Sequence, residues 1–304
     1  MASADVPARG LRVVLATDGS TDARAAGDWL GHFPLPASTR VLVVAVATLP
    51  PSPLDIPTVR EFYESLRGEA RRAAEDSATA LAPRFERTET RVVEGDPREV
   101  LVRVAREWDA DLLVVGARGL GAVKRFLLGS VSTTVLHHAP CSLLVARGTP
   151  GILRKVLVAV DASAHSLAAA RFVASLPLSP ALGIRLLSVV EPPRFPAPGA
   201  AMLAATAREV LAGWTPARKR QLAETLRRLE LEFKGKVASV NWSVEEGPPA
   251  ETIINAASEP GVDLVVVGAR GLGSVERLFI GSVSERVVHQ VERPILVVRS
   301  AGCS

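Results

Sequence analysis

The chain has 304 residues, of which 48% are hydrophobic and 22% are charged, a composition that is typical of globular proteins and excludes a disordered chain. Its 36 basic and 32 acidic residues leave a net charge of +4 without a long basic run, so the pI near 9.5 gives little support for nucleic-acid binding. Cys141 and Cys303 form neither a disulfide framework nor a metal-ligand pattern, and no apolar run approaches the roughly 20 residues of a membrane helix. We therefore expect a cytoplasmic protein with no amino-terminal signal pattern.

The first half of the chain alternates short apolar runs with helical patterns. Residues 12–17 are an apolar run that ends at Asp18, and residues 21–32 have helical periodicity closed by two prolines. Asp96 and Pro97 are typical of a helix start. The predicted strands are 12–17, 40–47, 90–94, 111–115 and 143–146, and the predicted helices are 21–32, 58–81, 97–107 and 130–138.

The second half repeats the first. The stretch LLVVGARGLGAVKRFLLGSVS at 112–132 returns as LVVVGARGLGSVERLFIGSVS at 264–284, an offset of 152 residues. The first strands, which end at Asp18 and Asp161, differ by only 143, so nine residues are inserted in the second half between Val189 and Gly247. The predicted strands there are 155–160, 184–190, 237–245, 263–267 and 295–298, and the predicted helices are 164–175, 200–233, 249–258 and 282–290.

This organisation predicts two domains of one fold class. Continuous Val, Leu and Ala runs indicate strands covered on both faces, hence a parallel sheet with helices on each side. Strict alternation of strand and helix predicts an α/β doubly wound fold. The helix and strand breakers at 148–151 mark the boundary, and we predict domains at 1–149 and 150–304. One large α/β domain is the alternative, and the constant offset argues against it.

The repeated loop has the features of a phosphate-binding site. Gly116 and Gly119 permit positive φ and a close approach of the backbone to a ligand, and the amides of such a turn form an anion-binding concavity. Gly129 precedes a helix whose first amides are unpaired, and Ser130 and Ser132 add hydroxyls in its first turn. The second half repeats the spacing with Gly268, Gly271, Gly281, Ser282 and Ser284. In the alternative interpretation the glycines only make a tight turn and Ser130 caps the helix; the recurrence of the motif favours ligand binding.

Charged residues accompany the loop in both halves. Asp18 and Asp161 end the first strands, where ligands bind in open α/β sheets, although helix capping explains Asp18 equally well. Arg118 and Arg270 either neutralise phosphate or are exposed loop arginines. Arg125 and Arg277 also recur, without an assigned role, and we expect ordinary helix-surface histidines at 137, 138 and 289.

Catalytic signatures are missing. The chain has no G-x-x-x-x-G-K-[ST] motif, and GARGLG is G-x-x-G-x-G instead of the dinucleotide fingerprint. No Ser-His-Asp, Cys-His or H-E-x-x-H arrangement is found, and no general base is evident beside the loop. The sequence therefore supports binding better than catalysis.

These residues resemble the universal stress protein family. The matching pieces are the two strand-end aspartates, both GARG…GSVS motifs, and the closing strands CSLLVA at 141–146 and RPILVV at 293–298. The resemblance covers almost the whole chain, as two tandem domains. It implies a five-stranded parallel sheet of order 3-2-1-4-5 in each half, and ATP binding, since the subfamily that keeps the glycine motif binds ATP. It also implies that the halves pair through their last strands as an intramolecular pseudo-dimer, and that such chains can form homodimers.

Carried over by position, the resemblance implies two ATP sites, with or without Mg²⁺. In the first site, adenine, ribose and phosphates would contact Ala16, Thr17, Asp18, Val46, Gly116, Arg118, Gly119, Gly129, Ser130, Val131 and Ser132. In the second they would contact Ala159, Val160, Asp161, Val189, Gly268, Arg270, Gly271, Gly281, Ser282, Val283 and Ser284. The second half departs from the first where Val160 replaces the hydroxyl of Thr17, and where the nine-residue insertion lies over the nucleotide edge.

We therefore expect an ATP-binding stress-response protein whose bound nucleotide sets its conformation or its protein partners, and the sequence favours binding over catalysis. A slow Mg-dependent ATPase that uses the same pocket is one alternative. A nucleotide-independent interaction scaffold, in which the glycines are only structural, is the other.

Overall fold

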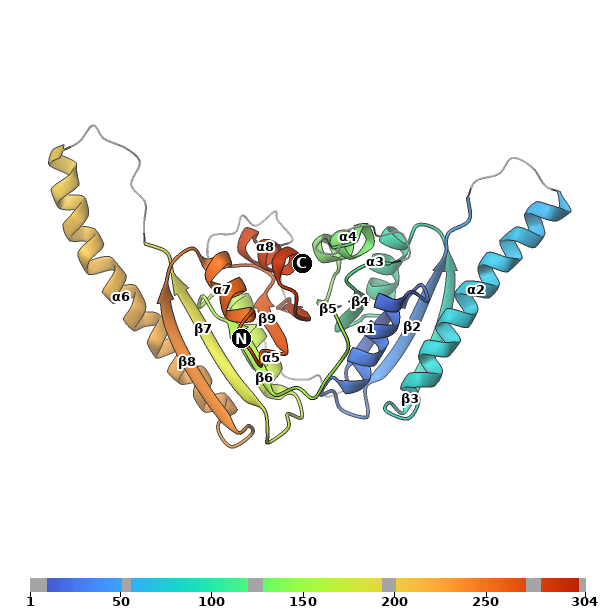
Figure 1. The fold of residues 1–304 in the computed structure, drawn as a ribbon, viewed down its shortest axis with the longest axis horizontal. Helices are drawn as coiled ribbons and strands as arrows, with labels where there is room; N and C mark the ends of the chain where they lie inside the picture. The colour runs from blue at the N-terminus through green and yellow to red at the C-terminus, as the bar shows by residue number, and fades with distance from the viewer. Residues whose placement is uncertain (1–9, 51–55, 120–127, 193–200, 272–279, 301–304) are drawn as a thin grey trace.

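The computed structural model describes residues 10–50, 56–119, 128–192, 201–271 and 280–300, and for 201–212 the backbone alone. Within each half of the chain, helices and strands alternate in these residues (Figure 1). The strands are β1 (Arg12–Thr17), β2 (Arg40–Ala47), β3 (Arg87–Glu94), β4 (Leu112–Gly116), β5 (Ser142–Ala146), β6 (Lys155–Ala159), β7 (Gly183–Val190), β8 (Ser239–Glu246), β9 (Leu264–Gly268) and β10 (Ile295–Val298). The helices are α1 (Thr21–His32), α2 (Pro57–Leu81), α3 (Pro97–Glu107), α4 (Ser130–His138), α5 (Ala164–Ser175), α6 (Ala201–Phe233), α7 (Pro249–Ala257) and α8 (Ser282–Gln290).

The described strands form one sheet of order β3-β2-β1-β4-β5-β10-β9-β6-β7-β8. Within each half the neighbouring strands are parallel, in the predicted order 3-2-1-4-5. The halves meet where β5 pairs antiparallel with β10, with Leu144 opposite Leu296. The last strand of each half is therefore the join, and the chain forms a tandem pair of doubly wound domains.

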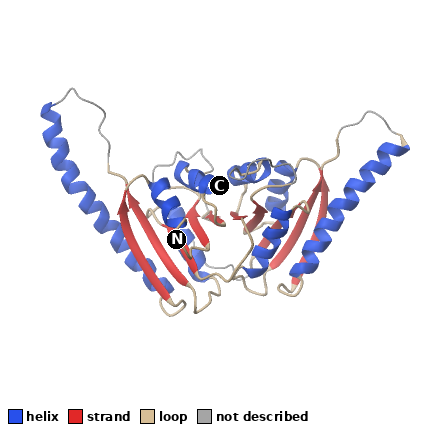
Figure 2. Ribbon diagram, viewed as in Figure 1, coloured by secondary structure: helices blue, strands red, loops and turns tan. Residues whose placement is uncertain are grey.

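The sheet is covered on both faces (Figure 2). Along β1, Val13 and Leu15 face one hydrophobic core together with α1 and α2, while Val14 faces a second core together with α3 and α4. The second half divides in the same way, with α5 and α6 on one face and α7 and α8 on the other. This two-sided burial explains why the inner strands are continuous apolar runs.

Two half-buried arginines tie the halves together beyond the strand pairing. Arg147 donates hydrogen bonds to the carbonyl oxygens of Val288, at 2.7 Å, and Val291, at the carboxyl end of α8. Arg299 donates in the mirrored direction to the carbonyl oxygen of Leu136 in α4, also at 2.7 Å. Burial lowers the pKa of Arg147 to about 10 and also lowers that of Arg299. Each guanidinium satisfies carbonyls that a helix end leaves unpaired, so the contact bridges the two halves.

The largest difference between the halves lies in the long helices at the outer edges of the molecule (Figure 1). Helix α6 has 33 residues where α2 has 25, so the insertion lengthens this helix at its amino-terminal side. In the described part of the chain, no helix is both long and apolar enough to cross a membrane.

Candidate functional site

A cavity of about 790 Å³ opens at the carboxyl ends of β1, β2 and β4 in the first half. The strand order reverses there, because the chain runs outward from β1 to β3 and returns to β4 on the other side of β1. This is the position at which open α/β sheets bind ligands. The cavity lining includes every residue that the sequence predicted for the first site: Ala16, Thr17, Asp18, Val46, Gly116, Arg118, Gly119, Gly129, Ser130, Val131 and Ser132.

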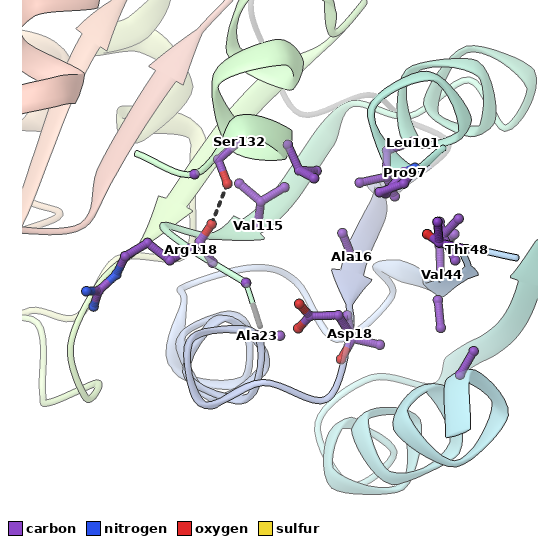
Figure 3. A pocket seen from close by; sticks show the side chains of 18 of the residues that line it. Ala16, Asp18, Ala23, Val44, Thr48, Pro97, Leu101, Val115, Arg118 and Ser132 are labelled. Atoms are coloured by element: carbon purple, nitrogen blue, oxygen red, sulfur yellow. Dashed lines mark hydrogen bonds between the residues drawn. The ribbon is translucent and has the colours of Figure 1, made fainter. Parts of the chain in front are cut away.

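Residues that the sequence did not predict complete the cavity. The end of β2 gives it an apolar floor that extends beyond Val46, and α2 gives it a wall through Leu66, Glu69 and Ala70. Pro97 and Leu101 of α3 lie on the opposite side (Figure 3). The helix wall carries no motif in the sequence. The one available signal is the run of small residues on the inner face of α2, where Ala74 is fully buried.

The motif glycines in β4 and the following loop lie in close contact with other residues of the first half. A Cβ on Gly116 would lie 2.6 Å from the carbonyl oxygen of Asp22, in the first turn of α1. A Cβ on Gly119 would lie 2.6 Å from Oδ2 of Asp18. Neither glycine has a positive φ, so the positive φ that a glycine permits is not used at these positions. Gly116 lets α1 lie against the end of β4, and Gly119 lets the loop lie against the carboxylate of Asp18.

Helix α4 begins at the cavity without a side-chain cap. Gly129 is the N-cap residue and Ser130 is the first helical residue, so the alternative in which Ser130 caps the helix is wrong. Ser130 is exposed beside the uncapped amides. The buried hydroxyl of Ser132 donates to the carbonyl oxygen of Gly116 at 2.7 Å and ties the helix to β4. The uncapped end leaves backbone amides with the positive end of the helix dipole on the cavity side.

Asp18 does not cap α1. The cap is Ser20, whose Oγ accepts a hydrogen bond from the amide of Ala23 at 3.2 Å. Asp18 is exposed, and its Oδ1 accepts from the amide of Ser20 at 3.0 Å. The carboxylate is thus held at the mouth of the cavity.

Arg118 lies differently from its predicted role. Its Nε is 2.9 Å from Oδ2 of Asp22, and the side chain points away from Asp18 and the cavity (Figure 3). The guanidinium is therefore already neutralised by a carboxylate of α1, so this geometry gives no support to a role in neutralising phosphate.

The second half has the same corner, by which we mean the loop after the fourth strand of a half, the aspartate after its first strand and the start of the helix that follows the loop. A Cβ on Gly268 would lie 2.6 Å from the amide nitrogen of Ser166, and one on Gly271 would lie 2.6 Å from Oδ2 of Asp161. Gly281 is the uncapped N-cap residue of α8, and Ser284 donates to the carbonyl oxygen of Gly268 at 2.7 Å. The backbone of the loop is therefore held by the same contacts in both halves.

Charge distinguishes the two corners. His165 takes the place of Asp22, so among the described residues Arg270 has no acidic partner corresponding to the one of Arg118. Burial, followed by the nearby Arg270, lowers the pKa of His165. The second corner thus has one negative charge fewer.

The remaining predicted residues have simple positions. His137 is not an isolated surface histidine, because its Nε2 lies 3.1 Å from Oε1 of Glu285 in α8. The described residues include no cluster of three or more side chains suited to a metal ion. Arg125 and Arg277 lie outside the described residues.

A doubly wound α/β domain with a cavity at its switch point belongs to the broad class of open α/β folds, whose ligands bind beyond the carboxyl ends of the strands. A comparison with protein-family models matches the universal stress protein family twice, at residues 11–147 and 153–299. The chain belongs to the universal stress protein family, as a tandem member.

Known relatives extend over the same length. A universal stress protein of Mycolicibacterium smegmatis is 28% identical over 94% of this chain and 96% of its own. The universal stress protein Rv2005c of Mycobacterium tuberculosis is 27% identical over 95% and 97%. The crystal structure of a universal stress protein from Archaeoglobus fulgidus aligns with a TM-score of 0.60 at 20% identity, covering 95% of this chain and 98% of that one. This last similarity is one of fold.

Proposed function

We propose that the protein binds an adenine nucleotide, ATP, in the cavity of the first half and acts as a nucleotide-dependent binding module in the stress response. The observation that carries this proposal is the shared cavity: residues from the ends of β1 and β2, from the β4 loop and from the start of α4 line one space. Its volume of about 790 Å³ lies within the range of ordinary small-molecule sites.

The lining divides into two ends that suit the two ends of a nucleotide. Val44, Val46 and Leu101 are apolar and suit the face of a base. Asp18 supplies an acceptor for a ribose hydroxyl or an exocyclic amine. The exposed Ser130 and the amides at the start of α4, which no side chain of the described residues caps, suit the phosphates, because hydrogen bonds and the helix dipole both favour an anion there.

Binding without turnover fits the side chains that are present. Among the residues that the structure describes, Asp18 and Glu69 are the acidic residues of the lining, and none of the described lining residues is a histidine or a lysine. If Mg²⁺ accompanies the phosphates, Asp18 and Ser130 are the oxygen donors nearest to them in this proposal. Nucleotide occupancy, and not phosphate transfer, is then the signal that a protein partner would read.

The test is calorimetry of the full-length, nucleotide-free protein with ATP. We expect saturable binding that Asp18→Asn and Ala70→Leu each weaken, the first through the lost charge and the second by filling the helix wall. Ala80→Leu is the matched control, since Ala80 is exposed on the same helix and lies outside the lining. Absence of binding at millimolar ATP, or equal weakening by the control, would overturn the proposal. Phosphate release that Asp18→Asn abolishes would favour the ATPase alternative.

A further inference from the structure

The second half keeps the loop of the first but not its helix wall. Equivalent ion pairs align the two long helices: Arg67 Nε lies 2.7 Å from Glu94 Oε1, and Lys219 Nζ lies 2.6 Å from Glu246 Oε1, each residue shifted by 152. By this alignment, the wall residues Leu66, Glu69 and Ala70 correspond to Arg218, Gln221 and Leu222. An apolar side chain, a carboxylate and a methyl group are thus replaced by a guanidinium, an amide and a larger apolar side chain.

Arg218 reaches across the position where the cavity would be. Its Nη2 donates to the carbonyl oxygen of Asp161, just beyond the carboxyl end of β6, at 3.0 Å. Its Nη1 donates to Oε1 of Gln221 at 2.7 Å, which fixes the guanidinium in place. Leu222, one turn further along α6, is 1% exposed. Side chains of α6 therefore contact the carboxyl-terminal edge of the sheet, where the first half has its cavity.

The floor is altered in the same direction. Ala45 of β2 corresponds to Ser188 of β7, which is fully buried and donates to the carbonyl oxygen of Val160. Ala47 corresponds to Val190, which is 2% exposed. Both of these floor residues are larger in the second half and add volume at the base end of the site, whereas the glycines and serines of the loop are unchanged.

We propose that the chain holds one nucleotide, in the first half, and that Arg218 and Leu222 close the base end of the second. This inference rests on the proposed function, because it assigns that function to one of two corners with the same loop. The guanidinium of Arg218 lies where a base would lie, and it already uses the carbonyl oxygen of Asp161 as an acceptor. The buried side chain of Leu222 fills the space that the smaller Ala70 leaves in the first half.

Stoichiometry measured by equilibrium dialysis with radiolabelled ATP tests the proposal on the full-length protein. We expect one ATP per chain at saturation. Leu66→Arg combined with Ala70→Leu, which transfers the second wall to the first half, should abolish binding. Arg218→Leu combined with Leu222→Ala should raise the value to two. Arg220→Leu, at an exposed position of α6, should leave it at one.

The outcomes separate this inference from the proposed function. No bound ATP in the wild type would refute the proposed function. Two bound ATP per chain in the wild type would refute the inference and leave nucleotide binding intact. One bound ATP per chain in the variant Leu66→Arg with Ala70→Leu would do the same. A second-half variant that is folded by circular dichroism and still binds one would refute the role of Arg218 and Leu222. If that variant does not fold, Arg218→Leu alone is measured, and ATP binding that remains strictly single would count against the role of Arg218.

Discussion

Replacing Gly116 by alanine separates the two roles that a motif glycine can have. The new Cβ would lie 2.6 Å from the carbonyl oxygen and 2.7 Å from the carbonyl carbon of Asp22. Both are main-chain atoms in the first turn of α1, so they move only if the helix moves. At Gly119 the Cβ would meet Oδ2 of Asp18 at the same distance, but that atom ends a side chain that can rotate. The two substitutions are chemically identical and structurally different.

The expected magnitudes follow from this difference. Overpacking a well-packed site costs about 1–3 kcal/mol, and we expect Gly116→Ala to lie near about 3 kcal/mol because the obstacle is backbone. In a domain of this size each kcal/mol lowers the melting temperature by roughly 2–4 °C, which predicts a decrease of about 6–12 °C. Gly119→Ala should cost less than about 1 kcal/mol, but it should weaken ATP binding because the carboxylate of Asp18 must turn.

Differential scanning calorimetry of both variants, combined with ATP titration, measures the two effects separately. Gly268→Ala repeats the experiment in the second half, where the Cβ would lie 2.6 Å from the amide nitrogen of Ser166. A Gly116→Ala variant that melts within about 1 °C of the wild type and yet fails to bind ATP would refute the packing argument. The glycine would then serve the ligand alone.

Three further outcomes are expected. Arg147→Ala leaves two carbonyls of α8 without their donor, so the free energy of unfolding in urea should fall by about 2 kcal/mol. Ala162 has a φ of 68° where Gly19 has 73°, so Ala162→Gly should raise the melting temperature through a gain of about 1 kcal/mol, and Gly19→Ala should lower it. Burial and Arg270 lower the pKa of His165, so the unfolded state binds more protons and stability should fall as the pH drops through the ordinary histidine value of about 6.5. Urea titrations between pH 5 and 8 should show this slope flattened in His165→Gln.

Each of these outcomes has a control or a contradiction. Arg154→Ala removes an arginine with an exposed side chain in the linker region and should change the urea midpoint little; an equal loss there would remove the capping explanation for Arg147. An unchanged melting temperature in Ala162→Gly would mean that the left-handed residue is unstrained. A pH slope that persists in His165→Gln would assign it to another group.

The inner part of the fold was accessible from sequence, and its edges were not. Strands β1, β4 and β9 are buried on both faces and appear as uninterrupted apolar runs. Strand β3 was predicted at 90–94 and begins at Arg87, because it is an edge strand with exposed charges at Arg87, Glu89 and Arg91. Charged side chains on an edge protect it from pairing with another chain, and they also hide its period.

The site shows the same limit. Residues at strand ends and helix starts follow from topology, and all those predicted for the first half line one cavity. The wall formed by Leu66, Glu69 and Ala70 lies on a helix with no motif, so only the packing of α2 on the sheet reveals it. The ion pair of Arg118 with Asp22 joins residues 96 positions apart, and nothing local to either predicts it. Homodimer formation and cytoplasmic location stay predictions.

The recurrence of the glycine motif needs a different interpretation from the one that the sequence favours. Two copies with identical spacing indicate a shared ligand only if the glycines exist for the ligand. Gly268 is required by the backbone of His165 and Ser166 in its own half, so packing alone preserves this glycine whether or not that half binds anything. Whether a half binds a nucleotide is better judged from residues that packing does not require, namely those on the inner face of the long helix. On α2 the small side chain of Ala70 lines the cavity, whereas on α6 the buried side chain of Leu222 fills the equivalent position. The residues of α2 and α6 therefore distinguish the two halves in nucleotide binding.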